Sequence, residues 1–378
     1  MGNKKITLTA ILTFLFFTST ALWAQTTVFE SGQDGYTCYR IPAIVKVRKT
    51  LLAFAEGRKN ACSDFGNVDL LMKKSLDGGK TWSKPTLLID YGELQAGNPA
   101  PVFDRSDPRF PEGRLFLFYN TGNRSEHDIV NGNGVREVFY ITSTNEGESW
   151  SEPVNITLQV HHPNEPSVNP AYTFSEDWRH YANTPGHALQ LANGTLFVPM
   201  NISEGPLVNN KIPYKAGAFY SENHGESFRN SALLKSKGSN ECTAVQLSNG
   251  EVILNARDQT EKTGKRYTAR SKDNGQSWYE ETIDPYLTDP VCEGSMQVIR
   301  QGKKEVVLIS QLFDPQKRKN LSLHVSYDGA HTWAKTITID PESSAYSDLV
   351  VLSKKKVGVL YEKDDYGKIV FKTVKIKP

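Results

Sequence analysis

Short stretches in which apolar and polar residues alternate follow one another along most of the chain. Examples of this period-two pattern are LFLFYN, VFYITS, GTLFVPMN, EVILNAR, LSLHVS and VGVLYE. Such alternation places one side of a β-strand against a core, and no long stretch has the spacing of an amphipathic helix. Turn residues such as Gly, Asn, Asp and Ser separate the stretches. The pattern therefore predicts an all-β protein.

One short motif recurs five times between these strands. It reads SLDGGKTW at residues 75–82 and returns as STNEGESW, SENHGESF, SKDNGQSW and SYDGAHTW. Short polar side chains hydrogen-bond their own backbone in a turn, Gly accepts a positive φ, and the final aromatic packs into a core. Repeated antiparallel units of this kind are typical of β-propeller blades. We expect a six-bladed β-propeller of four-stranded antiparallel blades, about 59 residues each, with the sixth blade closed by the N-terminal and C-terminal segments.

The first 24 residues have a different pattern. Lys4 and Lys5 precede an apolar run that ends in ALWA, which predicts a signal peptide cleaved after Ala24. Cleavage removes two of the 44 basic residues and leaves 42 against 42 acidic ones. This balance argues against a nucleic-acid or anionic-membrane binder, and residues 25–378 contain no second apolar stretch of roughly 20 residues. We expect a single exported domain at residues 25–378, periplasmic or extracellular, and a monomer.

The cysteines and the common catalytic motifs narrow the chemistry. Four cysteines (Cys38, Cys62, Cys242 and Cys292) are too few for a disulfide-built scaffold, and none forms a Cys-x-x-Cys pair. Three pairings are conceivable, and free, buried thiols fit at least as well. The chain has no Gly-rich phosphate loop followed by Lys, no Gly-x-Ser-x-Gly and no His-Glu-x-x-His. We expect no cofactor and no required metal.

The sequence YRIP at residues 39–42 occurs once, and here the chain resembles the exo-sialidases. The repeats are similar to the Asp boxes of that family. FAEGRKNACSDFGNVDLLMKKS, QAGNPAPVFD, NECTAVQLSNGEVILNARDQ, RKNLSLHVSYDG and AYSDLVVLSKKKVGVLYE look like sialidase segments in sialidase order. The boxes also occur in non-enzymatic propellers, and a turn repeated in every blade is structural. The whole resemblance implies a bacterial-type retaining sialidase with a tyrosine nucleophile, acting on sialylated glycans.

Sialic acid carries a carboxylate on its anomeric carbon, and arginine binds carboxylate oxygens two at a time. The resemblance assigns this binding to Arg40, Arg257 and Arg318. Arg40 begins one apolar strand and Arg257 ends another, so inner propeller strands would deliver both charges to the central cavity. Arg266 and Arg270 compete with Arg318, but the spacing before NLS favours Arg318.

The substrate's own charge bears on the choice of nucleophile. A carboxylate nucleophile about 4 Å from the sugar's carboxylate would be repelled by on the order of several kcal/mol in a partly desolvated site. A neutral tyrosine avoids this repulsion, and tyrosine-using sialidases are a recognised exception to the two-carboxylate rule of glycosidases. The resemblance implies Tyr346 as nucleophile and Glu241 as its base, because a phenol with a pKa of about 10 is a poor nucleophile alone.

Departure of the leaving-group oxygen needs a proton donor. The resemblance implies Asp64 in this role, and burial under a bound substrate would keep its carboxyl partly protonated. Asp69 is the nearest rival, but it lies within an apolar strand where a structural role fits better. The resemblance further implies that Arg58 contacts the hydroxyl side of the sugar and that Glu362 holds Arg40.

Several positions depart from the sialidase pattern. Asn145 stands where Asp is usual in one box, Gly329 is a shifted glycine, and Phe228 ends one box in place of Trp. Cys242 directly follows Glu241, where Ser is expected. These departures affect the regularity of the blades and remove no proposed catalytic group.

Two other functions share parts of this interpretation. A trans-sialidase, which passes the sugar to a second glycan, or an intramolecular trans-sialidase, which uses the sugar's own hydroxyl, would have every residue named above. Product analysis separates both from hydrolysis. A non-catalytic propeller that binds sialylated glycans would be expected to lose Asp64 or Tyr346, and this chain has both.

Overall fold

The computed structural model describes residues 25–376 apart from residues 167, 171–176 and 303. The described residues form 24 strands and two short helices, α1 (Glu126–Val130) and α2 (Thr157–Val160). None of these helices is long and apolar enough to cross a membrane. The all-β prediction is confirmed for this part of the chain. The expected signal peptide at residues 1–24 lies outside the described residues.

The strands fall into four hydrogen-bonded sheets, in which most neighbours along the chain pair antiparallel. In chain order they are β1 (Gln25–Glu30), β2 (Cys38–Val47), β3 (Thr50–Arg58), β4 (Val68–Ser75), β5 (Thr86–Ile89), β6 (Gln95–Asp104), β7 (Arg114–Gly122), β8 (Arg136–Ser143), β9 (Val154–Asn155), β10 (Trp178–Asn183), β11 (Leu189–Gln190), β12 (Leu196–Glu204), β13 (Tyr214–Ser221), β14 (Arg229–Asn230), β15 (Ser239–Gln246), β16 (Val252–Asp258), β17 (Lys265–Ser271), β18 (Glu280–Thr288), β19 (Ser295–Gln301), β20 (Lys304–Leu312), β21 (Lys319–Ser326), β22 (Lys335–Ser353), β23 (Lys356–Lys363) and β24 (Lys368–Lys375).

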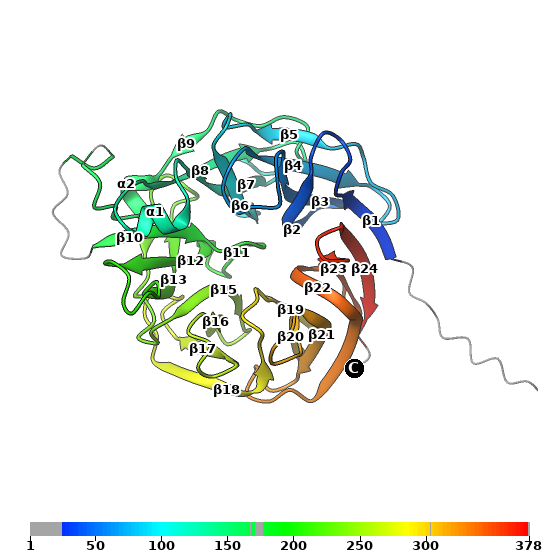
Figure 1. Ribbon diagram of the computed structural model, residues 1–378. Coiled ribbons are helices and arrows are strands. Elements are labelled where there is room, and N and C mark those ends of the chain that lie inside the picture. Colours follow the sequence, from blue (N-terminus) through cyan, green and yellow to red (C-terminus); the bar gives the residue numbers. More distant parts are fainter. Residues whose placement is uncertain (1–24, 167, 171–176, 303, 377–378) are drawn as a thin grey trace, which may run out of the picture.

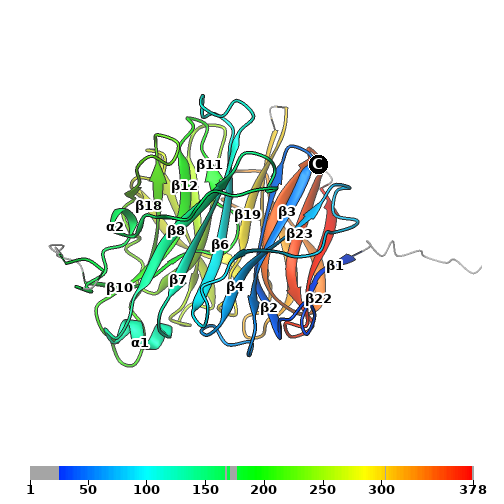
Figure 2. The same cartoon turned by 90° about the horizontal axis from the view of Figure 1, so that it is seen from above.

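The sheets are arranged in a ring. Figure 1 shows the chain running once around a central axis, with β2, β6, β11, β15, β19 and β22 nearest to it. Figure 2, turned by 90°, shows the strands of neighbouring sheets crossing the thickness of the molecule side by side. The starts of these inner strands are therefore candidates to meet on one face of the ring.

The two ends of the chain meet in one sheet. β1 pairs antiparallel with β24, from Gln25 opposite Lys372 to Glu30 opposite Lys368. The predicted closure by the N-terminal and C-terminal segments is therefore confirmed. The long strand β22 has two partners, since its first half pairs with β21 and its second half, from Ser344, pairs with β23. This sharing merges the last two groups of strands into one seven-stranded sheet.

The five repeated motifs occupy turns with one hydrogen-bonding pattern. In the first, Ser75 Oγ donates to Asp77 Oδ1 at 2.9 Å and accepts from the Gly79 N–H at 2.8 Å. The Thr81 N–H donates to Asp77 Oδ1 at 3.0 Å. Asn145 accepts the same backbone bond at 3.0 Å in the second motif. Asn therefore replaces Asp there without loss of the turn, because the turn needs only the side-chain oxygen.

The aromatic residue of a motif usually packs against the group of strands that precedes it. Trp82 packs edge-on against Phe371 of β24, with ring centres 5.6 Å apart. Trp150 likewise meets Phe54 of β3, at 6.2 Å. The motifs thus link neighbouring groups of strands around the ring.

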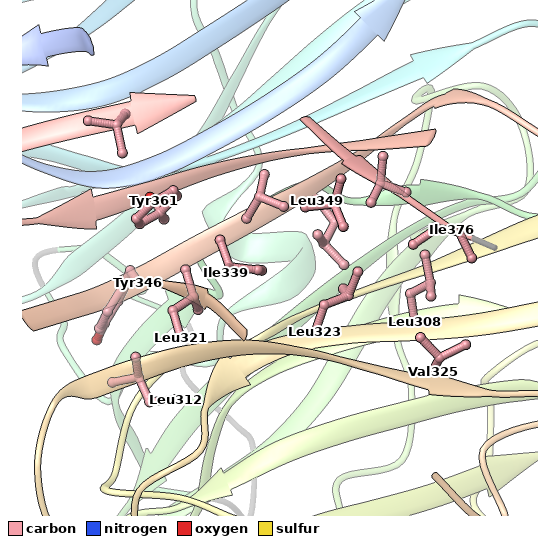
Figure 3. Close-up of a cluster of buried hydrophobic side chains, with 14 of the residues drawn as sticks. Leu308, Leu312, Leu321, Leu323, Val325, Ile339, Tyr346, Leu349, Tyr361 and Ile376 are labelled. Atoms are coloured by element: carbon pink, nitrogen blue, oxygen red, sulfur yellow. The ribbon is translucent and has the colours of Figure 1, made fainter. Parts of the chain in front are cut away.

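One apolar core lies between β19–β21 and the strands β22–β24. Figure 3 shows Leu308, Leu321, Leu323 and Leu349 within it, and Tyr346 at one end of the same cluster. Tyr346 is 6% exposed. Its ring is therefore held by core packing, while its hydroxyl is placed at the edge of the core.

Candidate active site

A β-bulge places Arg40. The pairing of β2 with β3 shifts register between Arg40 and Ala43. Within this bulge Ile41 has a φ of 59°, which is a rare conformation for a β-branched residue, and Pro42 has no N–H to offer the ladder. The Ile41 N–H donates instead to Glu362 Oε1 at 2.8 Å. Bulges re-aim side chains beside active sites, which explains a charged residue at the head of an apolar strand.

Register shifts interrupt other strands at candidate site residues. In β6 the shift surrounds Asn98, which has a φ of 53° and precedes Pro99 as Ile41 precedes Pro42. The shifts in β10, β15 and β22 surround His180, Glu241 and Tyr346 respectively. At a break in the hydrogen-bonded ladder, a side chain need not point to the face that strict alternation along the strand would give it.

Three arginines from distant parts of the chain surround Tyr346. The guanidinium carbon of Arg40 lies 5.1 Å from the centre of the Tyr346 ring, and that of Arg318 lies 5.7 Å from it. Arg257 Nη1 donates a hydrogen bond to the Tyr346 hydroxyl at 3.1 Å. The structure thus brings together the three arginines and the tyrosine that the sequence singled out.

Glu241 lies directly beside the Tyr346 hydroxyl. That hydroxyl is 2.8 Å from each Glu241 oxygen, and Arg257 Nη1 is 2.7 Å from Oε2. Burial raises the pKa of Tyr346 well above its usual range, more than Arg257 lowers it. Burial also raises the pKa of Glu241 in spite of Arg257. The phenol therefore keeps its proton in the free protein and donates a hydrogen bond to Glu241.

Glu362, at the end of β23, holds Arg40 from one edge. Arg40 Nε donates to Glu362 Oε1 at 2.8 Å, and Nη2 donates to Oε2 at 3.1 Å. Glu362 is fully buried and Arg40 is 6% exposed. A buried bidentate pair of this kind fixes the plane of the guanidinium. Arg40 Nη1 remains directed toward Asp64, 3.6 Å away.

Arg318 joins this cluster, whereas its two competitors are engaged elsewhere. Arg318 Nη1 donates to the Tyr366 hydroxyl at 3.1 Å. Arg266 is fully buried and forms an ion pair with Asp289 at 3.1 Å. Arg270 donates to a backbone carbonyl in the turn of the last repeat. The geometry therefore favours Arg318, in agreement with the spacing before NLS.

A disulfide anchors the loop that carries Asp64. Cys38 in β2 is bonded to Cys62, with Cα atoms 5.3 Å apart. Cys242 and Cys292 are free and buried. One disulfide thus forms and none of the three complete pairings is present, while the expectation of free, buried thiols holds for the other two cysteines. The cross-link ties the loop to the strand that presents Arg40.

Asp64 faces two arginines at the surface of the site. Its Oδ1 lies 2.8 Å from Arg58 Nη1, and its side chain is 82% exposed. Partial desolvation raises the pKa of Asp64, but Arg58 and Arg40 lower it further, so the net pKa lies below the usual range. The rival Asp69 is fully buried and accepts a hydrogen bond from the Tyr36 hydroxyl at 2.7 Å. That contact suits a structural role for Asp69.

Glu56 supports Arg58 from behind and was not singled out by the sequence. Arg58 Nη2 donates to Glu56 Oε2 at 2.7 Å, and Glu56 Oε1 accepts from the Asn98 N–H at 3.0 Å. A Cβ on Gly97 would lie 2.3 Å from the same Oε1, so any other residue there would displace the Glu56 carboxylate. The signal in the sequence was the period of two, because Glu56 and Arg58 lie on one face of β3.

A second polar cluster borders the site and was also missed. Glu126 of α1 accepts a hydrogen bond from the Tyr214 hydroxyl, and His180 Nε2 lies 3.5 Å from its Oε1. Arg136 is 5% exposed, and its charge acts on both Glu126 and Asp64. These residues come from four separate elements with no common spacing, so no motif announced them.

The described residues contain one group with the geometry for a metal, formed by Asp104, Asp107 and His224. Asp107 already forms ion pairs with Arg109 at 2.9 Å and Arg114 at 3.0 Å. His224 Nδ1 lies 2.8 Å from Asp104. Arg109 and Arg114 thus occupy the Asp107 carboxylate, and the contact of His224 with Asp104 links β6 to a repeat turn.

Residues 49–359 match the BNR repeat-like domain family. The chain belongs to this family. The matched residues include Arg58, Asp64, Glu241, Tyr346 and the five repeats. The family model therefore covers most of the ring.

Several curated relatives of this chain are sialidases. A sialidase of Bacteroides fragilis is 28% identical over 372 residues, which cover 93% of this chain and 64% of that protein. Sialidase-2 of Cricetulus griseus is 28% identical over 376 residues, which cover 91% of this chain and 93% of that protein. The solved Hadza microbial sialidase Hz136 has a TM-score of 0.78 and 24% identity, and covers 93% of this chain and 68% of that one. The chain therefore has the β-propeller-like fold of sialidases, although it spans less than two thirds of the Bacteroides relative.

Proposed function

We propose that the protein is an exo-α-sialidase, a glycoside hydrolase that releases terminal α-ketosidically linked sialic acid from glycoconjugates. The observation that carries this proposal is the convergence of Arg40, Arg257 and Arg318 around the Tyr346–Glu241 pair. A cluster of fixed positive charges around a neutral phenol suits an anionic sugar whose carboxylate adjoins the reacting carbon. The sialidase relatives support the same substrate class.

The proposed reaction has two displacements. The Tyr346 oxygen attacks the anomeric carbon and passes its proton to Glu241, 2.8 Å away, while Asp64 gives a proton to the departing glycan oxygen. Water, deprotonated by Asp64, then attacks the same carbon, and the phenol oxygen leaves with the proton returned from Glu241. Two inversions give net retention and free sialic acid.

The bound substrate has to change the ionisation of Asp64. In the free site Arg58 and Arg40 lower the pKa of Asp64, so this carboxyl is ionised near neutral pH. A substrate carboxylate bound to Arg40 would offset the cation and displace water from the loop. Both effects raise the pKa of Asp64 toward the protonated form that a general acid needs.

Replacement of the phenol oxygen tests the proposal. Tyr346→Phe removes the nucleophile and keeps the ring in its core, so release of free sialic acid should fall by about 1,000-fold or more with an unchanged unfolding midpoint. Tyr279→Phe is a matched control, because it removes an exposed hydroxyl that bonds Glu251. Full activity of Tyr346→Phe would refute the nucleophile, and no sialic acid release by the wild type would refute the function.

Product analysis distinguishes hydrolysis from transfer. NMR of the first product should show the α-anomer of free sialic acid, which then mutarotates. A sialylated second glycan or an intramolecular product would indicate a trans-sialidase. Binding of sialoside without any product would indicate a sialoglycan-binding propeller.

The proposal extends to the organisation of the whole chain. We infer six blades, because β22 serves two groups of strands and the single pairing of Val68 with Gln95 joins two others. The hydrophobic start of the chain supports cleavage after Ala24 and export to the periplasm or the outside of the cell. Mass spectrometry of secreted protein tests the cleavage, since a mature chain should begin at Gln25.

A further inference from the structure

The turn that joins β23 to β24 has an unusual backbone. Asp364, Asp365 and Tyr366 have φ values of 55°, 50° and 69°. Left-handed conformations are unfavourable for residues with a Cβ, and three in succession persist only where the surroundings hold them. Such strain is often found at functional sites, and here it sets the direction of the Tyr366 side chain.

Contacts on both sides fix this turn. Ser31 Oγ donates to the Tyr366 carbonyl at 2.7 Å, and the Ser31 N–H donates to the Gly367 carbonyl at 2.9 Å. On the other side Ser343 Oγ donates to Asp365 Oδ1 at 2.5 Å. The turn is therefore held between the end of β1 and the middle of β22.

The turn places the Tyr366 ring between two of the arginines. The guanidinium carbon of Arg40 lies 4.2 Å from the centre of this ring. The Tyr366 hydroxyl accepts the hydrogen bond from Arg318 Nη1 at 3.1 Å. Glu362, on the same hairpin, binds the edge of Arg40. One hairpin thus contacts the edge and the face of one arginine and a nitrogen of another.

We propose that Tyr366 is a positioning residue that holds Arg40 and Arg318 at a fixed spacing for the substrate carboxylate. Two guanidinium groups beside one small ligand repel each other before that ligand arrives. The π-face of Tyr366 attracts Arg40, and its phenol oxygen attracts Arg318, so both cations stay directed at the same place. This inference rests on the proposed function, because it assumes that the arginines bind a carboxylate.

Two substitutions separate the parts of this contact. Tyr366→Phe keeps the stacked ring and loses the bond to Arg318, so KM should rise about fivefold. Tyr366→Leu loses both contacts, so KM should rise about 30-fold. In both variants kcat should change by less than about threefold, since neither substitution touches the reacting atoms.

A matched tyrosine controls for general damage. Tyr279 also combines a cation–π contact, with Lys272 at 4.5 Å, and a hydroxyl bonded to a charged residue, Glu251. It is exposed, directly precedes β18 and lies outside the arginine cluster. Tyr279→Phe and Tyr279→Leu should leave KM unchanged. Unfolding midpoints of all four variants identify any that fail to fold. If Tyr366→Leu does not fold, KM of Tyr366→Phe provides the test.

Competitive inhibition by free sialic acid and by its methyl ester tests the mechanism itself. Esterification removes the carboxylate charge. For the wild type, the ester should therefore inhibit much more weakly than the acid, whereas for Tyr366→Leu the two should differ much less. If Tyr366→Leu weakens inhibition by the acid and by the methyl ester by the same factor, the inference is overturned while hydrolysis stands. The same holds if KM of the Tyr366 variants equals that of the wild type. If the wild type binds sialic acid without hydrolysing any sialoside, the proposed function fails, and the inhibitor comparison is repeated as a direct binding measurement. No binding of sialic acid by the wild type would overturn both.

Discussion

At the scale of single residues, the ionisation of Asp64 sets the conditions for the proposed chemistry. Its pKa is lowered in the free site, because Arg58 and Arg40 outweigh the effect of partial desolvation. A lowered pKa means that Asp64 holds its proton less tightly than a free carboxyl does. The protonated fraction that can act as an acid is therefore small near neutral pH and grows as the pH falls.

This sign predicts an acidic activity profile. For an alkyl sialoside, whose leaving oxygen needs a proton, kcat/KM should fall by up to about tenfold per pH unit above the pKa of Asp64. Asp64→Asn should lower kcat/KM for that substrate by about 100-fold or more. It should lower kcat/KM for a nitrophenyl sialoside little, because nitrophenolate leaves without a proton and the later attack of water does not enter kcat/KM. Initial rates across a pH series measure both effects.

Asp77→Asn is the matched control, since Asn145 shows that a repeat turn accepts Asn. It should keep the wild-type profile. Equal losses of kcat/KM with both leaving groups for Asp64→Asn would contradict the role of Asp64 as a proton donor.

At the scale of elements, three of the five repeat turns bring a glycine against an aromatic ring: Gly79, Gly225 and Gly275. Gly275 has a φ of 82°, and a Cβ there would lie 2.2 Å from Phe197 Cε2. Gly250 has a similar φ of 89° with nothing within 4 Å. The two glycines share the backbone requirement and differ only in the neighbour.

Alanine at each position separates these two causes. Gly250→Ala should lower the free energy of unfolding by about 1–2 kcal/mol, the cost of a left-handed Ala. Gly275→Ala should lose about 2–4 kcal/mol, because it adds overpacking against Phe197. Denaturant midpoints compare the two variants. Equal losses would show that the Phe197 side chain moves aside and that its close contact with Gly275 adds nothing to stability.

The alternation of strands and the repeated turns were predictable from the sequence because both depend on local spacing. The bulges were not, since an extra residue in a ladder shows only in the pairing with another strand. Asn98–Pro99 repeats the arrangement of Ile41–Pro42, and this pair was the available signal. Likewise Cys38–Cys62 could not be chosen among the six possible pairs of four cysteines, because the sequence gives no distances.

The site divides along the same line. Resemblance supplied Arg40, Glu241 and Tyr346, and the structure places them in contact. His180 and Tyr366 had no motif, because their neighbours come from other elements or from an unusual turn. The roles of such residues depend on contacts with distant segments, which no single stretch of sequence shows.

At the scale of the whole molecule, the ring depends on its closure. β1 contributes Val28 and Phe29, which are 2% and 1% exposed, and it covers the outer edge of β24. An open edge strand presents unpaired backbone groups to other chains. The short N-terminal strand therefore protects the molecule as well as adding to its core.

A chain that starts at Ser31 tests this closure against one that starts at Gln25. Loss of the two buried side chains should lower the free energy of unfolding by on the order of 3–6 kcal/mol, and the free edge should promote association. Unfolding midpoints and light scattering report the two effects. Identical midpoints and scattering would contradict the importance of β1.

Covalent labelling tests the central claim, that a phenol held by three arginines attacks the sugar. In 2,3-difluorosialic acid the fluoride at C2 leaves, and the fluorine at C3 slows breakdown of the resulting adduct. After incubation, peptide mass spectrometry should find the fluorosialosyl group on Tyr346, and the Tyr346→Phe variant should carry no label. Label on Glu241 or Asp64 in a protein that hydrolyses sialosides would contradict the account.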